Sequence, residues 1–288
     1  MKQIGLALGV IVLSFCLSFC SPTLPDFEPF ESDTEEVTEG TEAPIAPTLT
    51  LDRRRYSFTG KEEAISAEDD LLTIRQAGSY RLTGTLSEGG LCVDVGHEGV
   101  VRLILSGVTV ESTRRPALHV RSAAAVILEC EEGSVNLLRS TAQAVILSRS
   151  NLSLWGTGSL SLGGAPTAIR SDGYVTVRES TLRITASECG ISAEKGIEIV
   201  GGAVAINAAA VGLATEEDGS QSGGITLSGG SLTAVCSEVV LSARYRIRLM
   251  GGTGSFEAPG FYRCERLEQG KSVKGEILHT GGSFPDPL

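Results

Sequence analysis

The sequence repeats one short unit, with changed residues, between positions 144 and 260. Each copy holds an alternating apolar run, a tight polar or Gly-Gly corner, and a second alternating run, as in residues 197–207, 225–235 and 247–257. Alternation with a period of two is typical of a strand with one buried face. A repeat of about 20–30 residues that contains only strands and corners predicts a solenoid, because one copy cannot bury its apolar face alone.

The copies start at pairs formed by a small or polar residue and the apolar residue that follows it. These pairs begin at Gly90, Ala117, Ala144, Ala168, Gly190, Gly212 and Glu238. The intervals of 22 to 27 residues indicate that the strands keep their length while the corners vary. We therefore expect an all-β solenoid of about seven coils over residues 51–266, followed by a C-terminal tail at 267–288.

The composition limits both the core and the partners. The chain has 35 Gly residues and only 5% aromatic residues, so its core must consist mainly of Val, Ile, Leu and Ala. The net charge of −11 is concentrated in residues 21–50, which hold eight acidic residues and no Lys or Arg. The sequence has no basic stripe with interleaved aromatic residues, which argues against nucleic acid as a partner.

A signal peptide is predicted over residues 1–19. The apolar run at 4–19 is 16 residues long, too short for a membrane span and suited to a signal-peptide core. The Leu-Ser-Phe-Cys at 17–20 resembles the lipobox of bacterial lipoproteins, in its relaxed spirochaete-like form, because a Phe precedes the Cys where a small residue is usual. Cys20 is therefore the expected lipidation site. Cys16 in the same context is an alternative, and a plain secretory signal is the other interpretation.

Residues 20–50 are rich in Pro, Glu and Thr and hold few large apolar side chains. Burial cannot offset the entropy lost on ordering such a segment, so we interpret it as a flexible acidic linker after the lipid anchor. The expected localisation is extracytoplasmic, with the chain lipid-anchored to the bacterial cell envelope at the outer membrane or the cell surface. The membrane is then a partner through the N-terminal anchor.

Three segments carry a resemblance to a known family. They are the Ala-Gly-Ser-Tyr-Arg-Leu-Thr-Gly-Thr-Leu run at 77–86, the apolar run at 101–110, and the unit at 190–199 with its Gly-Gly corner. In this order, over about residues 70–260, they resemble bacterial carbohydrate-binding domain-containing proteins. The resemblance implies a single-stranded right-handed parallel β-helix akin to pectate lyases, and a polysaccharide as partner.

The same resemblance implies bound calcium and an acidic polysaccharide, because the coils of that family carry paired acids before the Gly-Ile step. This sequence departs from the pattern, since only Glu188 and Glu238 are acidic at those positions. We therefore predict no cofactor from these positions, and calcium stays an open alternative that depends on other acids.

One set of corner positions should stack as a column along the solenoid. Its members are Arg149, Asp172, Glu194, Ser222 and Arg244. Neighbouring carboxylates in and near this column would offer oxygen ligands to a hard cation such as calcium. The candidate calcium ligands are Asp172, Glu188, Glu194, Glu217 and Asp218. The alternative is a solvated corner column with Arg at each end.

A second column should point outward from the strands. Its members are Trp155, Arg178, Val200, Ser228 and Met250. Tyr174 and Arg246 fall on one more outward column. The Trp155 ring beside Arg178 would stack on a sugar, so Trp155, Arg178, Tyr174 and Arg246 are the candidate carbohydrate-binding residues. Alternatively, the ring and the cation pair with each other, or the ring shields the corner.

The remaining reactive residues form no recognisable site. The five Cys residues after Cys20 lie on or beside alternating apolar runs and form no Cys-x-x-Cys pair, which indicates buried free thiols. The three His residues are scattered, which argues against a zinc site. A phosphate-binding loop and a nucleophile elbow are also absent from the sequence.

The sequence therefore predicts a non-catalytic cell-envelope lipoprotein that binds an acidic or plant-type polysaccharide. One alternative is a surface β-helix with a structural or adhesive role and no sugar binding. Another is a polysaccharide lyase, which would need acids that hold calcium together with a Lys or Arg base, or paired carboxylates. The fold alone implies no activity. The oligomeric state is left open.

Overall fold

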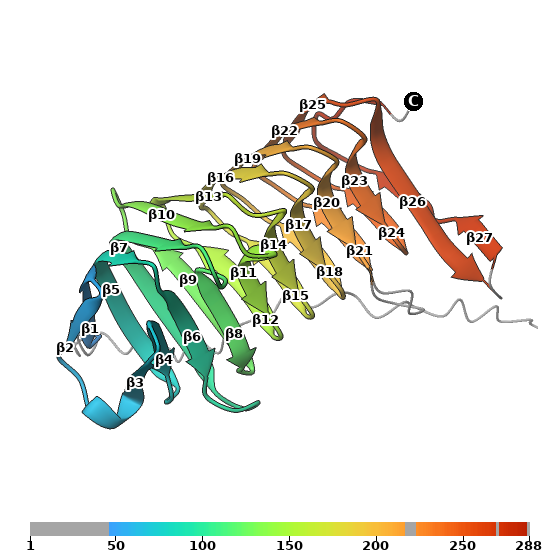
Figure 1. Cartoon of the computed structure of the whole chain (residues 1–288). Coiled ribbons are helices and arrows are strands. Elements are labelled where there is room, and N and C mark those ends of the chain that lie inside the picture. Colours follow the sequence, from blue (N-terminus) through green and yellow to red (C-terminus); the bar gives the residue numbers. More distant parts are fainter. Residues whose placement is uncertain (1–45, 217–222, 269–270, 287–288) are drawn as a thin grey trace, which may run out of the picture. The chain divides into compact units, whose positions relative to one another are not determined.

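The computed structural model describes residues 46–216, 223–268 and 271–286. These residues form a right-handed parallel β-solenoid of about eight turns, which confirms the predicted fold class (Figure 1). One short 3-10 turn, η1 (Glu62–Ala64), is the single helical element in this part of the chain. None of the described residues lies in a helix long and apolar enough to cross a membrane.

Three walls of parallel strands form the solenoid, and a typical coil contributes one strand to each wall. We call the walls sheets 1, 2 and 3, although sheets 2 and 3 are joined into one continuous sheet. Sheet 1 contains β6 (Gly90–Asp94), β8 (Leu118–Ser122), β11 (Ala144–Ser148), β14 (Thr167–Ser171), β17 (Cys189–Ala193), β20 (Val211–Thr215), β23 (Val239–Ala243) and β26 (Gly260–Glu268). Sheet 2 contains β9 (Ala125–Cys130), β12 (Asn151–Trp155), β15 (Tyr174–Val177), β18 (Gly196–Ile199), β21 (Gly224–Leu227), β24 (Arg246–Leu249) and β28 (Glu276–His279).

Sheet 3 completes each coil and is continuous with sheet 2 at the N-terminal end. It contains β10 (Val135–Ser140), β13 (Ser159–Gly163), β16 (Thr181–Ala186), β19 (Ala203–Ala208), β22 (Ser231–Cys236) and β25 (Thr253–Glu257). The long strand β7 (Val100–Ser112) passes from sheet 2 into sheet 3 without a break, because it pairs with β9 in sheet 2 and with β10 in sheet 3. On the preceding coil, the strand β5 (Gly78–Ser87) pairs with β7.

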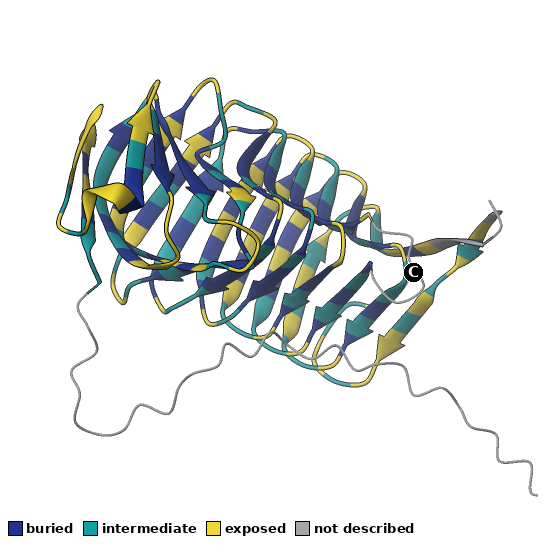
Figure 2. Ribbon diagram, turned by 90° about the horizontal axis from the view of Figure 1, so that it is seen from below, coloured by how far each residue is buried: buried dark blue, intermediate teal, exposed yellow. Residues whose placement is uncertain are grey.

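The core consists of apolar ladders, because strand pairing keeps the same position of successive coils in register. One ladder on sheet 2 contains Leu152, Val175, Ile197, Ile225 and Ile247. Each of these side chains is at most 2% exposed. Burial of one such side chain contributes roughly 1.5–3 kcal/mol, so every coil stabilises the coils on both sides of it. Figure 2 shows the resulting alternation of buried and exposed residues along the strands.

The Gly-Gly corners connect sheet 2 to sheet 3. They lie at 201–202, 229–230, 251–252 and 281–282, and the second Gly of each pair has a positive φ of 73° to 88°. A Cβ atom at Gly202 would lie 2.3 Å from the backbone oxygen of Ser180 on the preceding coil. These glycines are therefore required by the backbone geometry of the corner, in agreement with the strand–corner–strand repeat.

Two hairpins cover the N-terminal end of the solenoid. In the first, β1 (Thr48–Arg53) pairs parallel with β5 and antiparallel with β2 (Arg55–Phe58). In the second, β3 (Ile65–Glu68) pairs antiparallel with β4 (Leu71–Ile74), and β4 pairs parallel with β6. The ordered strands thus begin at Thr48, slightly before the expected start of the body at residue 51.

The C-terminal end is closed by strands and aromatic rings. The strand β28 pairs with β24 and extends sheet 2, while β27 (Lys271–Lys274) forms a hairpin with β26. The Phe256 ring lies 5.9 Å from Phe261, 6.0 Å from Tyr262 and 6.5 Å from Phe284, centroid to centroid. The expected tail at 267–288 therefore contributes two strands and one ring to the folded end.

The five Cys residues of the described body are free thiols. Cys92, Cys130, Cys236 and Cys264 are buried, and Cys189 is half-buried. This agrees with the prediction of free thiols on apolar strands. Burial raises the pKa of the Cys189 thiol to about 12 and that of the Cys130 thiol to about 11, so both stay protonated and unreactive.

Candidate functional site

The outer face of sheet 2, which we call the sheet 2 face, gathers the aromatic and charged residues that the sequence singles out. Three columns of outward side chains cross it. The first contains Asn151, Tyr174, Gly196, Gly224, Arg246 and Glu276, the second Ser153, Thr176, Glu198, Thr226 and Arg248, and the third Glu129, Trp155, Arg178, Val200, Ser228 and Met250. All four predicted carbohydrate-binding residues therefore lie on one face.

Trp155, the last residue of β12, is flanked by Glu129 on one side and Arg178 on the other. Strand pairing sets Trp155 opposite Glu129. The Arg178 backbone N–H donates to the Leu154 oxygen at 2.8 Å, which places Arg178 one coil further along. The central guanidinium carbon of Arg178 lies 5.9 Å from the centroid of the Trp155 ring. The structure thus brings these two residues together in a cation–π contact.

The Trp155–Arg178 pair borders a hollow of about 480 Å³. The residues that line it are Glu129, Trp155, Gly156, Arg178, Glu179, Val200 and Gly201. The lining thus combines an aromatic ring, one cation and two carboxylates, of which Glu129 is paired with Arg102. Apolar surface with a few convergent polar groups is the usual composition of a small-molecule or sugar site.

Glu179 lies at the rim of this hollow in an unusual backbone conformation. Its φ is 57°, in the left-handed region, where the preceding coil has Gly156 with φ 87°. A side chain in this region costs roughly 1–3 kcal/mol, and such strain is concentrated at functional positions. The exposed carboxylate of Glu179 is therefore a candidate site residue that the sequence pattern did not indicate.

Glu198 occupies the centre of the sheet 2 face and was also missed by the sequence analysis. It pairs with Thr176 on one side and Thr226 on the other. One of its carboxylate oxygens is buried and has no hydrogen-bond partner in the described part of the chain. Burial raises the pKa of Glu198 above its ordinary value of 4.5, and Arg178 opposes this shift. The signal available in the sequence was the alternation itself, which puts Glu198 two positions before Val200.

The Trp155 indole shows the same kind of unsatisfied polarity. Its Nε1 atom is buried and has no hydrogen-bond partner within residues 46–216, 223–268 and 271–286. A buried donor without an acceptor costs about 1–3 kcal/mol. Trp155 Nε1 therefore offers one hydrogen-bond donor, and the Glu198 carboxylate offers one acceptor on the same face. The two residues belong to adjacent columns.

Tyr174 and Arg246 lie on the first column, with two glycines between them. An added Cβ at Gly196 would lie 3.1 Å from the Tyr174 ring, so this ring lies over Gly196. Arg246 pairs through Nε with a Glu276 carboxylate oxygen at 2.6 Å. Its side chain is only 11% exposed. Arg246 is thus largely committed to Glu276, which makes it a weaker ligand contact than Arg178.

The corner column of sheet 1 differs in one member from the expected one. Strand pairing places Asp172, Glu194 and Glu216 on successive coils, with Arg149 before and Arg244 after them. The strand β20 continues to Thr215, so Glu216 takes the column position that the sequence assigned to Ser222. Ser222 itself lies outside the described residues.

Glu216 is already bound by its neighbours. One of its carboxylate oxygens accepts from the Ser192 hydroxyl at 2.6 Å, and the other lies 3.4 Å from an Arg170 nitrogen. The arginine offsets the carboxylate charge that a cation would need, and the serine hydroxyl occupies one of the carboxylate oxygens.

Of the predicted calcium ligands, Asp172 and Glu194 lie on successive coils of this column, whereas Glu188 does not join them. Glu188 precedes β17 and Glu194 follows it, so the strand separates them by about 20 Å at roughly 3.3 Å per residue. Glu217 and Asp218 lie outside the described residues. Within the described ranges, no group of three or more His, Cys, Asp or Glu side chains is arranged to hold a metal ion.

The fold is similar to one solved structure, described as the polysaccharide lyase-like protein from C. thermocellum in a gadolinium derivative. The similarity covers 83% of this chain and 100% of that chain, with a TM-score of 0.75 and 20% sequence identity. At this identity the likeness shows a shared fold.

Sequence comparisons point the same way. A carbohydrate-binding domain-containing protein of Acetivibrio thermocellus is 27% identical over 112 residues, which is 35% of this chain and 39% of the relative. The chain therefore matches about two fifths of that relative's length. The sequence model described as carbohydrate-binding domain-containing protein matches residues 68–282, from the second hairpin to the last Gly-Gly corner. The chain belongs to the carbohydrate-binding domain-containing protein family.

Proposed function

We propose that the chain binds polysaccharide on the sheet 2 face without cleaving it. The single observation that carries the proposal is the hollow bordered by the Trp155–Arg178 pair. An aromatic ring offers a stacking surface for a sugar ring, and a guanidinium fork binds carboxylates or paired hydroxyls in two-point contacts. Membership of the carbohydrate-binding family and the likeness to a polysaccharide lyase-like fold support this function.

Among polysaccharides, we propose an acidic one. Arg178 has no carboxylate within ion-pair distance in the described residues, so its charge is available to a uronate. Arg248 lies on the same face. The Arg246 charge, in contrast, is largely neutralised by Glu276.

The chain is further proposed to be a lipoprotein, anchored through Cys20 to the bacterial cell envelope. The apolar run at 4–19 and the Cys that follows it support this proposal. Labelling with a fatty-acid analogue in cells tests it. Cys20→Ala should abolish the label and release the protein from the membrane fraction, whereas Cys16→Ala should change neither. The reverse result would assign the lipid to Cys16, and absence of label in the wild type would leave a plain secretory signal.

The binding proposal is tested with the mature body on polygalacturonate, pectin, cellulose and chitin, each with calcium and with chelator. Retention on the matrix and release of cleavage products are measured together. We expect retention on polygalacturonate or pectin and no product. Product formation would show a lyase instead. Failure to bind any of the four glycans would contradict the proposal and favour the structural or adhesive alternative.

Matched variants locate the binding surface. Arg178→Gln removes a guanidinium from the sheet 2 face, and Arg183→Gln removes an exposed one from β16 in sheet 3. We expect the first to lower affinity by about tenfold, the usual effect of losing a charged hydrogen bond, and the second to have no effect. Equal effects of both variants would mean nonspecific attraction by surface charge.

A further inference from the structure

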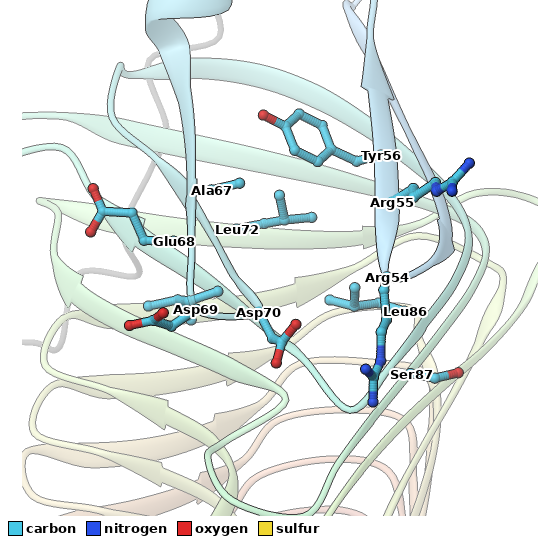
Figure 3. A pocket seen from close by; sticks show the side chains of 11 residues that line it. Arg54, Arg55, Tyr56, Ala67, Glu68, Asp69, Asp70, Leu72, Leu86 and Ser87 are labelled. Carbon is cyan, nitrogen blue, oxygen red and sulfur yellow. The ribbon is translucent and has the colours of Figure 1, made fainter.

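A second cavity lies at the N-terminal end, between the two hairpins that cover the first coil. It has a volume of about 140 Å³, and its lining includes Arg54, Tyr56, Asp70, Leu72 and Leu86. Figure 3 shows these side chains from close by, with Arg54 and Tyr56 on the first hairpin and Asp70 and Leu72 on the second. It is lined by other residues than the hollow at Trp155, which lies on later coils.

The two hairpin turns beside this cavity carry opposite charges. The register Asp52–Arg55 leaves Arg53 and Arg54 as the turn of the first hairpin. The register Glu68–Leu71 leaves Asp69 and Asp70 as the turn of the second. Within the described residues, no ion pair joins the two turns. Asp70 is instead paired with Arg114 at 3.6 Å. Arg54 on the first hairpin and Asp70 on the second therefore line the same cavity.

The acidic turn is held in a conformation that costs free energy. Asp69 has φ 47° and Asp70 has φ 62°, both left-handed. A two-residue turn of this type normally uses Asn-Gly or Asp-Gly, because Gly adopts positive φ without strain. Two adjacent carboxylates also repel each other. Such a turn persists only where the surrounding structure fixes it, so the Asp70 carboxylate is held beside the cavity, which is the kind of pre-organisation found at ligand sites.

The floor and one wall of the cavity are apolar. Leu72 and Leu86 are 5% and 4% exposed, so they present flat hydrocarbon at the end of the core. Tyr56 is 40% exposed, which leaves ring surface open to a ligand. A cavity of about 150 Å³ holds one benzene molecule, and a hexose has twice as many non-hydrogen atoms, so this cavity has room for one side of a pyranose ring while the other side stays in solvent.

We propose that this N-terminal cavity binds one neutral pyranose ring, at a site separate from the sheet 2 face. The Tyr56 ring and the leucine floor would cover the C–H faces of the sugar. The Asp70 carboxylate would accept from two hydroxyls, and the Arg54 guanidinium would donate to two others. Lining residues Arg54 and Arg55 offset most of the charge of Glu68, Asp69 and Asp70, so a charged sugar gains no advantage over a neutral one.

The test titrates glucose, galactose, mannose and galacturonate into the full chain and follows binding by ligand-detected NMR. Asp70→Asn removes the charge but keeps the turn, because Asn tolerates left-handed φ. Tyr56→Leu removes the ring. Arg183→Gln is the matched control, since it removes an exposed charge from β16, which contributes no residue to the cavity. The melting temperature of each variant verifies that it folds.

At least one neutral hexose should bind saturably, with affinity in about the millimolar range. Asp70→Asn and Tyr56→Leu should each weaken binding about tenfold or more, and Arg183→Gln and Trp155→Phe should not. Three outcomes would overturn the proposal: no neutral hexose binds, binding survives both cavity variants, or galacturonate is preferred. Trp155 is the only tryptophan of the chain, so its fluorescence reports the sheet 2 face alone and the two proposals can fail independently.

Discussion

The Arg178 guanidinium carbon lies 5.9 Å from the centroid of the Trp155 ring, one coil further along the sheet 2 face. A cation over an aromatic face fixes the orientation of both side chains. Both groups also border the same hollow of about 480 Å³. The contact therefore pre-organises a ring and a guanidinium for a common ligand, and Glu198 on the next strand adds an acceptor.

A first prediction follows from the shape of the guanidinium. Arg178→Lys keeps the positive charge but loses the planar fork that binds a carboxylate in two places. Affinity for polygalacturonate should fall about tenfold, which calorimetric titration measures. The corresponding Arg183→Lys on sheet 3 serves as control and should bind like the wild type. Full retention of affinity in Arg178→Lys would mean that only charge matters at this position.

A second prediction concerns Glu198 and pH. Burial raises the pKa of Glu198 in the folded protein above its ordinary value of 4.5. Between pH 4.5 and that raised pKa, the folded protein therefore keeps a proton on Glu198 that the unfolded chain has released. Stability falls as pH rises through that window, and Glu198→Gln removes this loss. The melting temperature of Glu198→Gln should exceed that of the wild type near pH 7 and match it near pH 4. An equal difference at both pH values would show that titration of Glu198 is not the cause.

A third prediction tests the corner geometry. At Gly202 φ is 82°, and an added Cβ would lie 2.3 Å from the Ser180 oxygen. Gly202→Ala should therefore lower the free energy of unfolding by about 2 kcal/mol or more. At Gly163 the nearest atom to an added Cβ is the Thr185 oxygen at 3.7 Å, so Gly163→Ala should be tolerated. Denaturant unfolding of both variants provides the comparison, and equal losses would contradict this account of the corners.

A fourth prediction concerns the thiols. Four of the five body cysteines are buried, and burial raises the pKa of Cys130 and Cys264 to about 11. The thiolate is the reactive form, so the folded body should react slowly with iodoacetamide and should react at all five positions after denaturation. Mass spectrometry counts the modified residues. Fewer than five modified thiols in the unfolded, unreduced body would reveal a disulfide.

The repeat was predictable because each copy carries its own alternation of apolar and polar residues. Alternation along the copies at 197–207 and 225–235 specifies which side chains face inward, and pairing then stacks Ile197 on Ile225. The outward columns follow from the same alternation, which places Trp155 and Tyr174 on strands of one sheet and Arg178 directly after a strand of that sheet.

Features that depend on distant segments were not predictable in this way. The C-terminal aromatic end needs Phe256 and Phe284 to meet, and no periodicity links them. The N-terminal cavity exists because two hairpins of unrelated sequence lie beside each other. In the corner column, the long loop after β20 shifts the spacing between strands, so counting back from the next strand assigned Ser222 to the position that Glu216 occupies.

The most direct measurement of the central claim is a fluorescence titration of the mature body with polygalacturonate. Trp155 is the sole tryptophan, so its emission reports on the sheet 2 face without labelling. The account predicts a saturable change in Trp155 emission whose midpoint equals the affinity measured by retention, and a weaker response in Arg178→Gln. Retention of the protein on polygalacturonate with unchanged Trp155 emission would contradict it, because the glycan would then bind elsewhere on the solenoid.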